Sequence, residues 1–149
     1  MNTRFYGVTS LALVGIATVI AASVLFGVSW LLGGIYLILS ATGAGGIIYA
    51  YCAKCPCKAH CAHVIPGKLA RNINRQPGPY TTLEQVVVVT ALVAILGLPQ
   101  PWLWRSLWLF IAYWVLALVA FVEILSFVCR TCGNVHCPVK MMRTAGNRK

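Results

Sequence analysis

The residues of this chain best suited to chemistry are seven cysteines and three histidines, and all ten lie in two short clusters. The first cluster reads Cys52-Ala-Lys-Cys55-Pro-Cys57-Lys-Ala-His60-Cys61-Ala-His63, and the second reads Cys129-Arg-Thr-Cys132-Gly-Asn-Val-His136-Cys137. Both follow the pattern Cys-x2-Cys, then three or four residues, then His-Cys. A Cys-x2-Cys pair lets two thiolates hold one ion from a tight turn, and two more ligands complete a tetrahedron. The repeated spacing therefore predicts metal binding.

The predicted metal ligands are nine residues: Cys52, Cys55, Cys57, His60, Cys61, Cys129, Cys132, His136 and Cys137. Two pairings are open. Each cluster can close its own four-coordinate site, from Cys52, Cys55, His60 and Cys61 and from Cys129, Cys132, His136 and Cys137. Alternatively, the two Cys-x2-Cys pairs meet across the helix ends, which leaves Cys57, Cys61, Cys137 and a histidine for another site. The spacing does not decide between these pairings, nor whether Cys57 and His63 are ligands.

Zinc is the predicted cofactor, because it accepts three cysteines with one histidine, or four cysteines, and needs no redox partner. An iron–sulfur cluster is the alternative, since Cys55-Pro56 and Cys137-Pro138 loosely fit the cysteine–proline pairs of ferredoxin-type runs. Four basic residues are expected to offset the negative charge of a thiolate site of either kind: Lys54, Lys58, Arg130 and Lys140. Reduced cysteines without a metal are the plain alternative.

Thiol–disulfide exchange is a third hypothesis for the same cysteines. Two Cys-x2-Cys pairs in a four-helix membrane protein resemble the general layout of quinone-linked disulfide-forming enzymes, and the resemblance is architectural only. Reactive pairs normally gain thiolate character at a helix N-terminus. Cys52 and Cys129 follow the predicted C-termini of helices, where the helix dipole disfavours an anion. This placement argues against the redox hypothesis.

Four apolar segments position the clusters. The chain has 149 residues, of which 60% are hydrophobic and 9% charged, and this composition is typical of an integral membrane protein. We predict one all-α domain over residues 1–149, with four transmembrane helices at about 6–27, 35–51, 82–98 and 102–128. They would form two tandem hairpins, each followed by a Cys/His-rich element. Thr81-x2-Glu84 has the form of a capping box, and Pro99 and Pro101 end the third helix.

The charge distribution predicts the orientation. Eleven of the twelve basic residues lie in the N-terminus, the connection 52–80 or the tail 129–149, and Arg105 is the exception. The positive-inside rule then predicts a multi-pass protein of the inner (plasma) membrane with both termini, and a metal-binding cap, on the cytoplasmic side. Structural disulfides are disfavoured on that side. The basic residues that give the net charge of +10 lie where the positive-inside rule places them. Nucleic acid is therefore not a predicted partner.

The connection between the second and third helices carries a second pattern. Ile65, Leu69 and Ile73 recur every four residues, while basic residues fall on another face: Lys68, Arg71 and Arg75. This pattern predicts a short amphipathic helix that contacts the anionic membrane lipids of the inner leaflet. Docking against an acidic partner is the alternative.

Two features inside the predicted spans bear on function. Glu123 lies near the inner end of the fourth helix. We expect an interfacial ion pair with a nearby Arg or Lys there, and the alternative is a role in proton movement or in holding a metal ligand in place. The second helix carries the small-residue pairs Ala41-x3-Gly45 and Gly46-x3-Ala50. We expect packing within the bundle from these pairs, ahead of docking to another subunit.

These observations favour a non-catalytic, metal-binding accessory or assembly subunit of a larger membrane complex, with membrane or cytoplasmic-face subunits as partners. The alternatives are an iron–sulfur electron-transfer subunit and a membrane thiol–disulfide enzyme. The predicted spans contain no histidine, which excludes a bis-histidine haem within the bilayer.

Overall fold

The computed structural model describes residues 3–58, 61–134 and 137, and over this part of the chain it is helical without strands. Four helical stretches are long and apolar enough to cross a membrane: Thr3–Val28, Trp30–Cys52, Thr82–Leu103 and Leu107–Val128. Their outward side chains are large and apolar, as in Val19 and Leu118, which suits contact with lipid. The predicted all-α fold is therefore confirmed for the described residues, with four helices that are long and apolar enough to span a membrane.

The elements and their bounds are as follows. The first two spans are α1 (Thr3–Val28) and α2 (Trp30–Ile47), and α2 continues as a π-helix, η1 (Ile48–Cys52). The connection contains α3 (Val64–Arg71). The third span comprises α4 (Thr82–Gly97) and α5 (Gln100–Leu103), and the fourth comprises α6 (Leu107–Glu123) and the π-helix η3 (Ile124–Val128), after which comes α7 (Cys129–Thr131).

Three predicted boundaries were wrong. The first turn is a single extended residue, Ser29, so the second helix begins at Trp30 and not at residue 35. The fourth helix begins at Leu107 and not at residue 102, because α5 and a turn ending at the extended Ser106 occupy 100–106. Residues 102–104 are as apolar as a span, so hydropathy alone does not place this break. The connection helix ends at Arg71, short of Arg75, where asparagines of low helix propensity follow.

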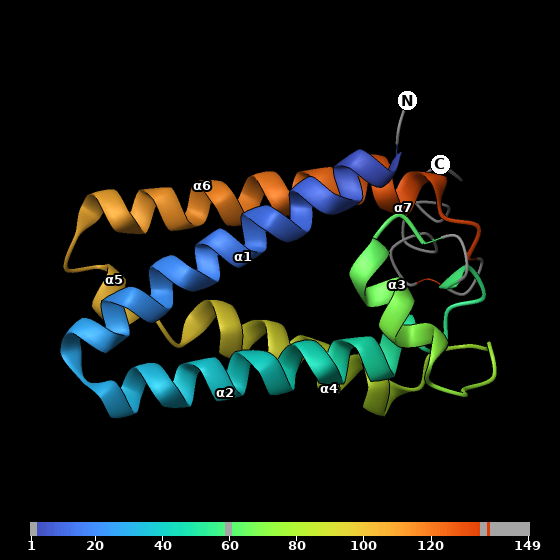
Figure 1. Cartoon of the computed structure of the whole chain (residues 1–149), viewed down its shortest axis with the longest axis horizontal. Coiled ribbons are helices and arrows are strands. Elements are labelled where there is room, and N and C mark those ends of the chain that lie inside the picture. The colour runs from blue at the N-terminus through green and yellow to red at the C-terminus, as the bar shows by residue number, and fades with distance from the viewer. Residues whose placement is uncertain (1–2, 59–60, 135–136, 138–149) are drawn as a thin grey trace, which may run out of the picture.

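The four spans do not pack as an even bundle. α1 packs against both α2 and α6, and α4 packs against α2. Figure 1 shows α1 crossing from α2 at one end of the molecule to α6 at the other, so that α1 separates from α2 towards the end that holds α3 and α7. The short α3 lies at the open end and contacts both α1 and η1. We call this end, which also holds α7, the cysteine face.

The opposite end depends on the proline that breaks the third span. Pro99 has no backbone N–H, so the carbonyl of Ile95, one turn earlier, lacks its usual helical donor. Two tyrosine hydroxyls from other helices donate to this carbonyl instead, Tyr36 of α2 at 3.2 Å and Tyr113 of α6 at 3.3 Å. Both tyrosines are only 1% exposed. Within a membrane an unpaired carbonyl is costly, so this shared acceptor ties three helices together.

Glu84 organises the start of α4 at the cysteine face. The predicted capping box is present, with the Thr81 hydroxyl accepting from the Glu84 N–H and the Glu84 carboxylate accepting from the Thr81 N–H. The same carboxylate pairs with Lys54, which follows η1, and with Arg75 of the connection. One side chain therefore joins the end of the second span, the connection and the third span.

The shared acceptor at Ile95 gives a testable expectation. Tyr113→Phe should lower the free energy of unfolding by about 1 kcal/mol, because it removes one interhelical hydrogen bond. The same change should cost less in a Pro99→Ala background, where the restored N–H already serves the Ile95 carbonyl. Reversible unfolding in mixed micelles of the four proteins of this double-mutant cycle measures the difference. Equal costs in both backgrounds would show that the hydroxyl and the proline are not coupled.

Candidate metal centre

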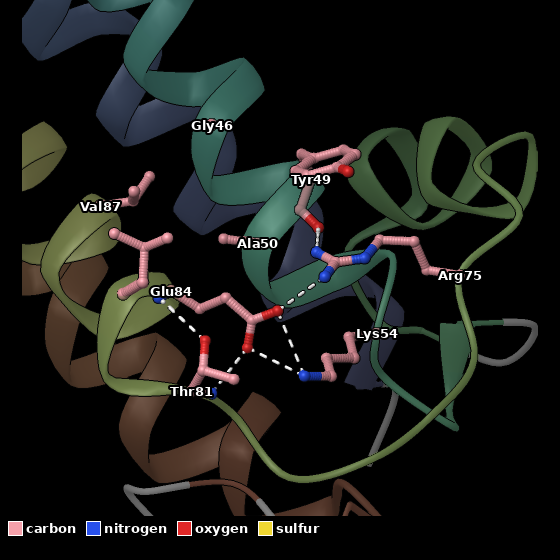
Figure 2. A pocket seen from close by; sticks show the side chains of 9 residues that line it. Gly46, Tyr49, Ala50, Lys54, Arg75, Thr81, Glu84 and Val87 are labelled. Carbon is pink, nitrogen blue, oxygen red and sulfur yellow. Dashed lines mark hydrogen bonds and ion pairs between the residues drawn. The ribbon is translucent and has the colours of Figure 1, made fainter.

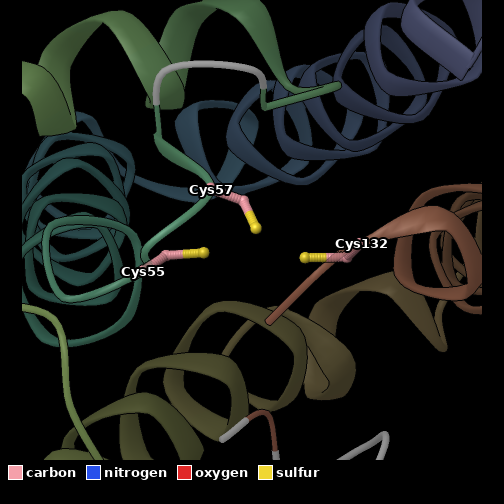
Figure 3. A group of neighbouring side chains, drawn as sticks. All are labelled: Cys55, Cys57 and Cys132. Atoms are coloured by element: carbon pink, nitrogen blue, oxygen red, sulfur yellow. The ribbon is translucent and has the colours of Figure 1, made fainter. Parts of the chain in front are cut away.

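Three thiols converge at the cysteine face. The sulfur atoms of Cys55, Cys57 and Cys132 all lie within 4.8 Å of one another, and each side chain is half-buried. Figure 3 shows Cys55 and Cys57 approaching from the segment after η1 and Cys132 from the segment after α7, with their sulfur atoms directed towards one another. Residues far apart in the sequence therefore form one potential ligand set.

The two Cys-x2-Cys pairs have the same local turn. The N–H of Cys55 donates to the carbonyl of Cys52 at 3.2 Å, and the N–H of Cys132 donates to the carbonyl of Cys129 at 3.3 Å. Each turn follows a π-helix, η1 in the first case and η3 in the second. Short π-helical segments are rare and frequently lie at functional sites. Here each π-helix ends a span at the first cysteine of a Cys-x2-Cys pair or directly before it.

The remaining described cysteines surround this group. Burial raises the pKa of Cys61, which also senses the charges of Cys57 and Cys132. Burial, followed by the nearby thiols of Cys137 and Cys132, raises the pKa of Cys129 to about 11. The hydrogen bond to Cys132, followed by burial, raises the pKa of Cys55. Without a metal, these three thiols are protonated at neutral pH.

The observed grouping matches neither predicted pairing in full. It takes Cys55 and Cys57 from the first cluster and Cys132 from the second. Cys57, whose role the sequence left open, is a member. Cys52 and Cys129 lie at the helix ends rather than in the group, while the predicted ligands His60 and His136 are outside the described residues.

His63 has a different position from the other candidates. Its Nδ1 lies 3.0 Å from the carbonyl oxygen of Gly7 in α1, which can only accept, so Nδ1 carries the hydrogen. Burial lowers the pKa of His63, which keeps the imidazole neutral. A Cβ atom at Gly7 would lie 2.2 Å from the Ala62 carbonyl oxygen, so only glycine permits this approach. The contact fastens the first turn of α1 to the cysteine segment.

The three-thiol group fits a small thiophilic ion. Zinc–sulfur bonds of about 2.3 Å in a tetrahedron place sulfur atoms about 3.8 Å apart, which small side-chain movements reach from the observed spacing. Three cysteines need one further ligand to complete a structural tetrahedron. Cys61 is a candidate, because it interacts electrostatically with two members of the group, Cys57 and Cys132. When bound, the metal would supply the positive charge that three thiolates require.

Lys54 and Lys58 were expected to offset the negative charge of the thiolates, but both bond to other groups. Lys54 makes its ion pair with Glu84. Lys58 donates to the backbone carbonyls of Ala53, Ile73 and Arg75, at 3.4 Å in each case, and so closes the connection over the first cluster. Both ammonium groups are therefore engaged away from the three sulfur atoms.

Asn134 and Tyr80 belong to the site, although the sequence pattern did not single them out. The Asn134 amide donates to the sulfur of Cys55 at 3.7 Å and to the hydroxyl of Tyr80 at 2.8 Å. Asn134 is 3% exposed, and Tyr80 stacks on Tyr51 at 4.3 Å between ring centroids. An N–H donor to a ligating sulfur orients that sulfur and tunes the metal.

The other predicted site residues lie outside the thiol group. Lys68 and Arg71 are exposed in the last turn of α3, and Arg75 pairs with Glu84. Glu123 accepts a hydrogen bond from the Thr9 hydroxyl at 2.9 Å, which joins α6 to α1. Both ion pairs of the described residues involve Glu84. The ion pair expected for Glu123 is therefore not among them.

Comparison of the chain with protein-family models, curated proteins and solved structures finds no match. The function is therefore argued from the site.

The raised thiol pKa values give a direct expectation. In metal-free protein, the alkylation rate of Cys129 should rise about tenfold per pH unit up to pH 10 or beyond, because only the thiolate reacts. An ordinary cysteine levels off above its pKa of about 8.5. Quantitative mass spectrometry of iodoacetamide adducts follows each thiol, with the denatured chain as the control. A plateau below pH 8 in the folded protein would instead indicate an activated, redox-type cysteine.

Proposed function

We propose that this chain is a metal-binding accessory or assembly subunit of a larger membrane complex, with its thiolate centre at the cytoplasmic membrane face. The observation that carries the proposal is the convergence of Cys55, Cys57 and Cys132 within 4.8 Å. The distribution of basic residues supports the cytoplasmic orientation, because the cysteine segments share one side with the basic connection and tail.

The proposed role of the metal is to fasten the open end of the bundle. Cys55 and Cys57 follow the second span, which packs with α4, whereas Cys132 follows the fourth span, which packs with α1. Structural zinc contributes an apparent 10–16 kcal/mol in small zinc-finger peptides, roughly the whole stability of a typical domain. An ion at this position is therefore strong enough to hold the ends of the second and fourth spans together.

Zinc is the metal that we propose. The close spacing of the sulfur atoms suits a single ion, because a cluster of several irons needs its thiolates further apart around the cluster. Iron remains the second candidate, as the centre of an electron-transfer subunit. It is favoured by the additional thiols of Cys61 and Cys129 beside the group and by the N–H donor at Cys55, since hydrogen bonds to sulfur set iron–sulfur potentials.

A non-catalytic role is supported by the chemistry of the acids and thiols. The chain has two carboxylates in all, and both are engaged, Glu84 in two ion pairs and Glu123 with Thr9. The raised pKa values of Cys55, Cys61 and Cys129 are opposite to the lowered values on which thiol–disulfide exchange depends. The site therefore suits a held metal better than a reacting thiol.

Membership of a complex is supported by the small residues of α2. Gly46 and Ala50 face inward, where a Cβ at Gly46 would lie 3.4 Å from Val87 of α4. Ala41 and Gly45 are exposed, with nothing within 4 Å of a Cβ built at Gly45. The expectation that both small-residue pairs pack inside the bundle thus fits only the second pair. The outward pair offers a close approach to a transmembrane helix of another subunit.

Metal content in single-cysteine variants tests the proposed centre. Cys55→Ser and Cys132→Ser should each lose the bound metal, because one ion takes ligands from both clusters. Cys52→Ser is the matched control, since its thiol lies outside the group, and it should keep the metal. Elemental analysis per chain, on protein purified in detergent without oxygen, measures the loss. Retention of half the metal in both ligand variants would contradict a shared centre and indicate one site per cluster.

A further inference from the structure

A cavity lies at the cysteine face, between α2 and α4. Its volume is about 280 Å³, and its wall combines charged groups with apolar ones. The charged groups are Lys54, Arg75 and Glu84, and Figure 2 shows them meeting at one side of the cavity. The cavity shares no residue with the three-thiol group, so it needs an explanation of its own.

The charged side of the cavity has one positive charge in excess. The Glu84 carboxylate accepts from the Lys54 ammonium at 3.0 and 3.2 Å and from the Arg75 guanidinium at 2.8 Å. Among the described residues, these two cations share this one carboxylate. The Glu84 side chain is 9% exposed, whereas those of Lys54 and Arg75 are 15% and 27% exposed. The shielded group is the anion, and the cations remain open to a ligand.

Arg75 is held in place for such a role. Its second guanidinium nitrogen donates to the Tyr49 carbonyl at 3.1 Å, and its central carbon lies 4.6 Å from the centre of the Tyr49 ring. These contacts fix the plane of the guanidinium, as Figure 2 shows. A fixed guanidinium is suited to the planar, paired hydrogen bonds that a phosphate oxygen pair accepts.

The other side of the cavity is apolar and belongs to the membrane spans. Gly46 of α2 and Ala50 of η1 provide one wall, and Val87 and Leu83 provide the α4 wall. Leu83 is 73% exposed and the neighbouring Val86 is 54% exposed, so this wall continues into the outward surface of α4. A ligand that fits both sides must carry an anionic head and an apolar body.

We propose that this cavity binds one anionic phospholipid, with its phosphodiester at Lys54 and Arg75 and its acyl chains along the outward faces of α2 and α4. The phosphodiester would balance the excess positive charge. The site lies at the ends of two spans, which is the depth at which lipid phosphates and basic residues meet. The proposal does not depend on the metal or on the proposed function.

The exposed cations of α3 serve as a control that distinguishes a specific lipid site from a general attraction of basic residues to anionic lipid. Lys68 and Arg71 lie at the same face and carry the same charge, but they do not line the cavity. A diffuse attraction to anionic lipid would depend on all four cations alike, at a similar energy for each. A site depends on Lys54 and Arg75 far more than on the α3 pair.

The test is native mass spectrometry of the full chain released from mixed micelles with equal amounts of dioleoylphosphatidylglycerol and dioleoylphosphatidylcholine. The protein should retain one phosphatidylglycerol, in about tenfold preference to phosphatidylcholine. Lys54→Gln and Arg75→Gln should each reduce that retention about tenfold, and Lys68→Gln and Arg71→Gln should leave it unchanged. Inorganic phosphate at the same concentration should not displace the lipid, because it cannot use the apolar wall.

Three results would overturn the proposal. Equal losses in the cavity and α3 variants would indicate diffuse attraction, and equal retention of the two lipids would show that the anionic head is not recognised. Displacement by inorganic phosphate would indicate a free-phosphate site. Because Lys54→Gln leaves Glu84 with one partner and can destabilise the fold, Gly46→Leu is the second variant. It keeps every charge but fills the cavity, and it too should lose the lipid.

Discussion

The constraint on which this structure depends is that the segment after the second span must meet the segment after the fourth at one membrane boundary. The spans themselves do not bring this about, because α1 leaves α2 for α6 towards that boundary. Hydrogen bonds and ion pairs between several segments join them at this boundary. The Gly7 carbonyl binds His63, Glu84 joins Lys54 to Arg75, and Asn134 reaches from the last described segment to Tyr80 and Cys55. The three thiols lie where these contacts converge.

Lipid offers polar groups within the spans no partner, and two such groups are paired across helices. The carbonyl released by Pro99 is served by two tyrosines, and Glu123 is served by Thr9. At the cysteine face the same rule acts on charge. The carboxylate of Glu84 has two cations beside it, whereas Lys54 and Lys58 of the first cluster bond to groups other than the half-buried thiols. A thiol group so placed stays neutral or takes a metal cation, and the proposed zinc centre follows from that choice.

The sequence predicted what depends on local pattern. Four apolar runs of sufficient length gave the spans, Thr81 and Glu84 gave the capping box, and the cysteine spacing indicated thiol clusters at the helix ends. It did not predict what depends on contacts between distant segments. Cys57 lies beside Cys132 because the segments after two different spans converge, and no pattern marks Asn134. The prolines predicted the end of the third helix, but the start of the fourth helix was placed at 102 instead of Leu107, because the apolar residues 102–104 do not reveal the turn that ends at the extended Ser106.

X-ray absorption spectroscopy of the purified protein at the edge of its bound metal identifies both the element and its neighbours. The proposed zinc centre should give a zinc spectrum with three or four sulfur neighbours at about 2.3 Å and no scattering from a second metal. An iron edge with iron–iron scattering would contradict the structural zinc centre and favour the electron-transfer alternative. A metal coordinated mainly by oxygen or nitrogen would contradict the three-thiol site itself.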